Sequence, residues 1–168
     1  MSERVYDPNR RQYYEFRRDG EVLVVDVFIA PGGDVPTHIH PHQQERWTVI
    51  AGRVRFKVDG RRSTPAPGVT VTVPAGVRHS FKNAGGEEAH ARAEVRPAMR
   101  LREFLEDGAA LARAGLYTRR GLVKSPHGAI QMAKFVERYR DETVVCWPPQ
   151  MVQRLLSPLA RLGERTPR

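Results

Sequence analysis

Short runs of alternating residues, closed by glycine and proline, constrain the fold of this chain most strongly. Between residues 53 and 58, every second residue is apolar and the residues between are basic. This two-residue period is typical of a β-strand with one buried face. Further β-type runs cover residues 21–29, 69–73 and 88–96, and turn signals rich in glycine or proline separate them. Short strands at this spacing predict an antiparallel sandwich or barrel.

The pattern changes after Pro97, where apolar residues recur at helical spacing. We expect one helix over residues 101–115. A second begins at Ser125-Pro126, because serine can cap a helix and proline suits its first position. A third apolar stripe covers residues 151–162, with an internal proline and several arginines. A basic helix on a membrane surface is one interpretation of this stripe. We favour contact with the protein's own β-rich part or with a second subunit.

The charge balance excludes some partners and leaves others open. The chain carries 28 Lys and Arg against 19 Asp and Glu, a formal net charge of +9, and most of the excess lies in residues 98–168. No zinc finger or aromatic RNA-binding motif is present, so we expect no nucleic-acid partner. No apolar run approaches the length of an integral membrane helix. The single Cys146 excludes an internal disulfide, and the N-terminus lacks an apolar signal, which together favour the cytoplasm.

Four residues in the β-rich part have the chemistry and spacing of a metal site: His38, His40, Glu45 and His79. Residues two apart in a strand point to the same face, so both imidazoles of the His-Ile-His sequence can reach one ion. Glu45 follows at an odd offset and needs a turn, which residues 41–44 can provide. His79 follows a separate turn and can approach from another strand.

Three imidazoles and one carboxylate suit one divalent transition metal, which can be Fe, Mn, Ni, Cu, Co or Zn. This donor set does not determine which metal binds. Four protein ligands leave two positions of an octahedral site for dioxygen or a chelating substrate. The alternative interpretation is the remnant of a site that has lost its metal.

Two complete motif spacings contain these four residues. The first, G-x5-H-x-H-x4-E-x6-G, is reproduced by Gly32…His38-x-His40…Glu45…Gly52. The second, G-x5-P-x-G-x2-H-x3-N, is reproduced by Gly68…Pro74-x-Gly76…His79…Asn83. Both motifs resemble those of the cupin superfamily, and the chain is similar to a single-domain cupin (monocupin). A lone His-x-His would be weak support, whereas both motifs in order are specific.

The resemblance implies an all-β jelly-roll β-barrel that holds the metal inside. It covers residues 20–97 as the cupin β-barrel. Residues 1–19 remain as an N-terminal segment and residues 98–168 as a C-terminal α-helical extension. Helices after a cupin domain often pack on the barrel or at a dimer interface, so the resemblance also implies a homodimer.

Three aromatic residues fall on the inward phase of their predicted strands: Trp47, Phe56 and Phe81. We expect them to bind the substrate, and core filling is the alternative. His42 lies in the turn after His40. We expect His42 to stand behind the ligands or at the rim of the site rather than to serve as a fifth ligand.

The resemblance extends to cupin dioxygenases of the quercetinase type, which use this ligand set. It implies a metal-dependent oxidoreductase that acts on a small organic molecule, with Glu45 also serving as the catalytic base. A non-redox metal-dependent isomerase, cyclase or lyase is one alternative. A non-catalytic cupin that binds or senses a small molecule is another, although the sequence after the barrel lacks a convincing helix-turn-helix.

Overall fold

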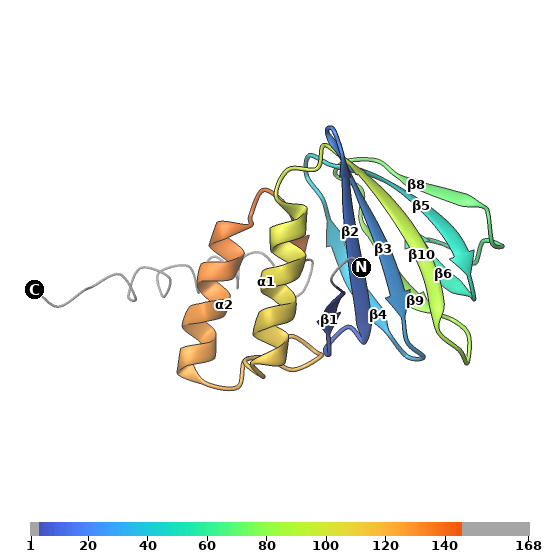
Figure 1. Ribbon diagram of the computed structural model, residues 1–168. Helices are drawn as coiled ribbons and strands as arrows, with labels where there is room; N and C mark the ends of the chain where they lie inside the picture. Colours follow the sequence, from blue (N-terminus) through green and yellow to red (C-terminus); the bar gives the residue numbers. More distant parts are fainter. Residues whose placement is uncertain (1–3, 146–168) are drawn as a thin grey trace, which may run out of the picture.

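A computed structural model describes residues 4–145 of this chain, and in it two antiparallel sheets form a β-sandwich with two helices at one side (Figure 1). The six-stranded sheet contains, in order, β1 (Val5–Asp7), β2 (Gln12–Asp19), β3 (Val22–Ile29), β10 (Ala89–Arg96), β5 (Gln44–Ala51) and β8 (Thr70–Val73). The five-stranded sheet contains β11 (Val144–Val145), β4 (Asp34–Ile39), β9 (His79–Asn83), β6 (Val54–Val58) and β7 (Arg61–Ser63). The predicted antiparallel jelly roll with a helical extension is confirmed.

Alternation along the strands determines which side chains fill the space between the sheets. Buried residues alternate along β10 and along β3 from Val25 onward, and the inward residues of β10 before Val95 are alanines. Ala93 lies opposite Trp47 on β5. A small side chain at this position leaves room for the indole ring, and close-packed interiors depend on such pairing of large and small residues.

The six-stranded sheet extends past the predicted boundary at residue 20 into the N-terminal segment. Strand β2 pairs with β3 along its whole length, from Gln12 opposite Ile29 to Asp19 opposite Val22. Tyr14 is buried in the core, and Phe16 packs against it. The described part of the N-terminal segment therefore supplies strands β1 and β2 to one edge of the six-stranded sheet, and inward side chains such as Tyr14 pack in its core.

Both described helices begin where the sequence predicts. Helix α1 covers Leu101–Arg113, and α2 covers Pro126–Arg138. The Ser125 hydroxyl accepts a hydrogen bond from the backbone N–H of Gly128 at 3.0 Å, which caps α2. Leu101 belongs to the core of the sandwich, so α1 is anchored to the β-domain. The predicted third helical stripe at 151–162 lies outside the described residues.

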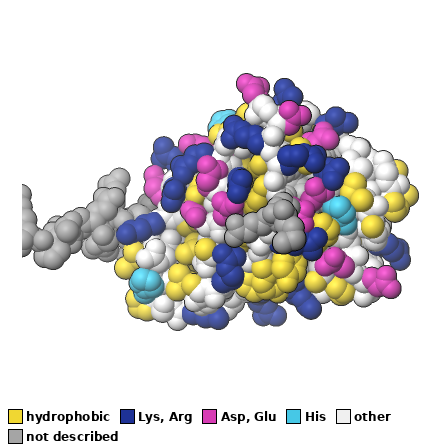
Figure 2. All heavy atoms as spheres, viewed as in Figure 1, with side chains coloured by type: hydrophobic (Ala, Val, Ile, Leu, Met, Phe, Trp, Pro, Cys, Tyr) yellow, Lys and Arg dark blue, Asp and Glu magenta, His cyan; other side chains and the backbone are white. Residues whose placement is uncertain are grey.

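After α2 the chain returns to the sandwich, and β11 pairs with β4 at the edge of the five-stranded sheet. Among residues 4–145, no helix has the length and apolar character needed to cross a membrane. On the face shown in Figure 2, basic and acidic side chains are interspersed. Arg102 and Glu106 of α1 form a surface ion pair at 2.8 Å.

Candidate metal centre

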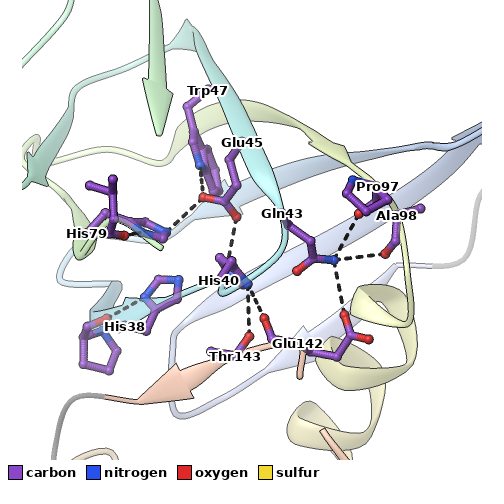
Figure 3. Close-up of polar contacts among 12 residues, drawn as sticks. His38, His40, Gln43, Glu45, Trp47, His79, Pro97, Ala98, Glu142 and Thr143 are labelled. Atoms are coloured by element: carbon purple, nitrogen blue, oxygen red, sulfur yellow. Dashed lines mark hydrogen bonds and ion pairs between the residues drawn. The ribbon is translucent and has the colours of Figure 1, made fainter. Parts of the chain in front are cut away.

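The structure brings together the four residues predicted as metal ligands (Figure 3). His38 lies on β4, His40 directly follows this strand, and His79 begins β9, where it is paired with His38 across the ladder. Glu45 comes from β5 in the opposite sheet. All four residues are buried, with exposed fractions between 3% and 8%. One ligand nitrogen from each histidine lies within 4.8 Å of the other two, so the three buried histidines can hold a metal ion.

Backbone carbonyls fix the tautomer of all three imidazoles. The Nδ1 atom lies 2.9 Å from the Pro36 oxygen in His38, 2.7 Å from the Glu142 oxygen in His40, and 2.9 Å from the Val77 oxygen in His79. A carbonyl oxygen only accepts hydrogen bonds, so Nδ1 must carry the proton in each ring. In the neutral ring, Nε2 then carries the lone pair, which is the arrangement that a metal-ligating histidine requires.

Glu45 faces these lone pairs with both carboxylate oxygens. Its Oε1 lies 3.2 Å from His40 Nε2, and its Oε2 lies 3.0 Å from His79 Nε2. The indole Nε1 of Trp47 donates a hydrogen bond to Oε2 at 2.8 Å. His79 Nε2 is not aligned for a hydrogen bond, and this buried nitrogen has no hydrogen-bond partner in the described chain. A nitrogen lone pair and a carboxylate repel each other unless a proton or a metal cation lies between them. The donor set therefore fits a cation.

The electrostatics of the site shift the pKa values of His38 and His40 in opposite directions. Burial lowers the pKa of His38 well below its usual value, and the positive charges that His79 and His40 can carry act in the same direction. Burial also lowers the pKa of His40, but the Glu45 carboxylate outweighs burial, and the net direction is upward. For Glu45, burial raises the pKa, but His40 and His79 hold it well below its usual range. His38 is therefore neutral and able to bind a metal near pH 7, whereas His40 competes for a proton.

The segment after α2 contributes to the site, and the sequence reasoning missed it. The Glu142 carbonyl orients His40, 102 residues away, and Thr143 Oγ1 lies 3.2 Å from the same Nδ1 atom. Next to it, Val145 of β11 is paired with His38. The β-branched run Thr143-Val144-Val145 was the available signal of a strand, but nothing in it indicates that this strand lies beside β4.

The Glu142 side chain holds this segment in place. Its carboxylate is 3% exposed and accepts hydrogen bonds from the backbone N–H of Arg100 at 3.0 Å and from Gln43 Nε2 at 3.2 Å. Gln43 Nε2 also lies 3.2 Å from the carbonyl oxygens of Pro97 and Ala98. Gln43 sits two residues before Glu45, so one buried polar network joins the start of α1, the β4–β5 turn and the segment after α2.

The three predicted substrate-binding aromatics lie side by side in the interior. Ring centroids are 4.6 Å apart for Trp47 and Phe81, 5.9 Å for Trp47 and Phe56, and 6.0 Å for Phe56 and Phe81. All three are buried and belong to the core cluster next to Glu45. His42 is exposed in the turn between β4 and β5. The described contacts of the four predicted ligands do not include His42.

Comparison with known proteins relates part of this chain to a family. The model of the cupin domain family matches residues 25–93. Polyketide synthase CurC of Streptomyces cyaneus is 32% identical over 63 residues, which are 38% of this chain and 41% of that protein. A mannose-1-phosphate guanylyltransferase of Klebsiella pneumoniae is 29% identical over 59 residues, which are 35% of this chain and 12% of that protein. The chain thus spans less than half the length of these curated relatives.

Solved structures are similar over more than half of this chain. An uncharacterized conserved protein with a double-stranded β-helix domain from Klebsiella pneumoniae subsp. pneumoniae MGH 78578 has a TM-score of 0.50 and 26% identity, covering 56% of this chain and 80% of that chain. An RmlC-like cupin from Shewanella frigidimarina NCIMB 400 has a TM-score of 0.52 and 21% identity, covering 59% of this chain and 86% of that chain, a likeness of fold. With two complete motifs, a matching family model and this fold, residues 25–93 form a cupin domain.

Proposed function

We propose that this protein is a metal-dependent enzyme of the dioxygenase type that oxidises a small organic molecule. The observation that carries the proposal is that ligand nitrogens of three buried histidines lie within 4.8 Å of one another, with the buried Glu45 carboxylate 3.2 Å from His40 Nε2 and 3.0 Å from His79 Nε2. His38, His40, Glu45 and His79 would hold one divalent transition metal. Three neutral nitrogens and one carboxylate leave a net positive charge on such a cation, which favours an anionic oxygen of the substrate as a further ligand.

When bound, a redox-active metal supplies the electron transfer between substrate and dioxygen that this chemistry requires. The residues of the chain supply position and proton transfer. Trp47 fixes Glu45 through its N–H, and the carbonyls behind the three imidazoles fix the rings. Because the pKa of Glu45 is low, its carboxylate can take a proton only from a group that is itself acidified, such as an enol beside a cation. The proposal is therefore restricted to enolic or similarly acidic substrates.

The comparisons support an organic substrate without defining the reaction. CurC is named as a polyketide synthase, and it is similar to this chain over 63 residues. The guanylyltransferase carries a different name and matches over a small part of its length, so the two names do not agree on one reaction. The ligand geometry, rather than either relative, is the basis of the proposal.

Metal content tests the site directly. We expect about one equivalent of transition metal per chain by elemental analysis of the purified protein, and loss of this metal in His79→Ala. His127→Ala is the matched control, because His127 is exposed on the first turn of α2. One full equivalent of metal in His79→Ala would show that the ligand assignment is wrong.

Oxygen uptake tests the chemistry. The protein is loaded separately with Fe, Mn, Ni, Cu, Co and Zn and offered a panel of flavonols and other enols. We expect oxygen consumption with at least one redox-active metal and none with Zn. Conversion without oxygen uptake would instead indicate an isomerase, cyclase or lyase. Stoichiometric binding without conversion under every metal would indicate a binding protein.

A further inference from the structure

A groove with a volume of about 450 Å³ opens between the two edge strands β7 and β8. Part of its lining is apolar and half-buried, and consists of Val58, Val71 and Val77. Each of these valines neighbours the site: Val58 lies opposite His79, Val71 lies opposite Trp47, and Val77 precedes His79 by two residues. The groove therefore borders the candidate metal centre on the side where the sandwich is open.

The strand register connects the metal centre to a cation at the rim of this groove. Val145, His38, His79, Val58 and Arg61 form one row of directly paired residues across the five-stranded sheet. Directly opposite residues in an antiparallel ladder point to the same face, so Arg61 shares the inner face with His79. Neighbouring strands lie about 4.8 Å apart, which places the two backbones on the order of 10 Å from each other. A small organic molecule can span this distance.

The charge of the groove favours an anion. Arg61 and Arg62 both line it, both are exposed, and neither forms an ion pair with another residue in the part of the chain that the structure describes. The one acidic residue that lines the groove is Asp59, in the turn before them. The Arg61 guanidinium beside a half-buried apolar wall is suited to an organic acid with an apolar body, whereas Arg62 is paired with Lys57 and shares the outer face of the sheet. The planar guanidinium fork matches a carboxylate through two parallel hydrogen bonds.

We propose that this groove binds the carboxylate of the substrate, with Arg61 as the residue that recognises it. The apolar body of the substrate then lies along the valines, and its reactive end points toward the metal centre. This inference rests on the proposed function, because it names the substrate class of that site as small organic carboxylates.

Binding of simple probes to the purified full-length protein tests the assignment. Benzoate and phenylacetate serve as carboxylates, benzyl alcohol as the neutral analogue, and phenyl phosphate as a different anion, each followed by NMR titration and calorimetry. We expect the carboxylates to shift the amide signals of Val58, Val71 and Val77. Arg61→Gln should weaken their binding about 10-fold or more, and Arg61→Lys should weaken it less. Benzyl alcohol should bind weakly and equally to all of these proteins.

Arg55→Gln is the matched control, because Arg55 is an exposed arginine on β6 that points to the outer face of the same sheet. Equal carboxylate affinity in wild type and Arg61→Gln would overturn the proposal, as would saturable binding of phenyl phosphate but not of benzoate. Absence of saturable binding by either carboxylate would also overturn it.

The His79→Ala variant separates this proposal from the proposed function. We expect benzoate to shift the valine signals in His79→Ala even after the metal is lost, because Arg61 and the apolar wall are intact. Binding that disappears in His79→Ala but is unchanged in Arg61→Gln would place the carboxylate on the metal and refute the groove. Retention of metal in His79→Ala would refute the proposed ligand set while the Arg61 comparison still decides the groove.

Discussion

Replacing Glu142 by alanine should weaken both the fold and the metal centre, although this residue lies in the helical extension. The carboxylate is buried and accepts hydrogen bonds from the backbone N–H of Arg100 and from Gln43. Gln43 retains the carbonyls of Pro97 and Ala98, so the main loss is an unpaired N–H at Arg100. Loss of a hydrogen bond to a charged acceptor and the resulting cavity should lower the free energy of unfolding by about 2–4 kcal/mol.

The same change should act on the metal through His40. Without its anchor, the segment that carries the Glu142 carbonyl is no longer held against the Nδ1 atom of His40. Loss of a partner that orients a ligating histidine typically costs about 10–100-fold in metal affinity. Urea unfolding followed by circular dichroism measures the first effect, and competition with a chelator at pH 7.5 measures the second.

Two variants make the experiment specific. Burial raises the pKa of Glu142, although the hydrogen bonds from Arg100 and Gln43 act to lower it. The neutral Glu142→Gln avoids this burial of charge and retains one acceptor, so we expect a loss of only about 1 kcal/mol. Glu137→Ala, at an exposed position of α2, should change stability by less than about 0.5 kcal/mol. Unchanged metal affinity in Glu142→Ala, despite lower stability, would refute the role of the extension in the site.

Three further predictions concern the site and the sandwich. Metal affinity, measured by calorimetry between pH 5 and 8, should already fall as the pH drops toward about 6.5, because Glu45 raises the pKa of His40 above this ordinary value and a bound proton excludes the metal. Constant affinity down to pH 5 would argue against histidine ligation. Trp47→Phe retains a ring but removes the hydrogen-bond donor to Glu45, so the free energy of unfolding should fall by about 1–3 kcal/mol in thermal unfolding. An unchanged midpoint would show that this hydrogen bond contributes little to stability. Gly52→Ala should lower the free energy of unfolding in urea by more than about 2 kcal/mol, since Gly52 has φ +75° and an added Cβ would lie 2.8 Å from the Ala89 Cα. A loss below about 1 kcal/mol would show that the structure relaxes around this contact.

Local periods in the sequence were sufficient for the central strands of the sandwich and for bringing His38 and His40 to one side of a strand. The two-residue spacing of His38 and His40 and the turn required before Glu45 follow from strand geometry alone. The inward phase of Trp47, Phe56 and Phe81 was equally readable, and all three are buried. Whether inward rings fill a core or line a cavity depends on the residues opposite them, such as Ala93, and no local period contains that information.

The contacts that sequence reasoning missed are non-local. The hydrogen bond between His40 and the Glu142 carbonyl joins residues 102 positions apart, and pairing of β11 with β4 has the same range. Strand β2 was hidden for a different reason. Its inward residues Tyr14 and Phe16 alternate with Tyr13 and charged residues, so its outer face is not uniformly polar and the period is weak. Such pairing is determined by the neighbouring strand rather than by the segment itself.

Glu45 reaches the centre from one sheet, and the three histidines reach it from the other. A cation held by all four would therefore cross-link the two sheets of the sandwich. The sheets could not separate without releasing the metal. Ligand-linked stabilisation of this kind makes the melting temperature depend on the concentration of free metal. Resistance to heat would then report the occupancy of the centre even before any substrate is known.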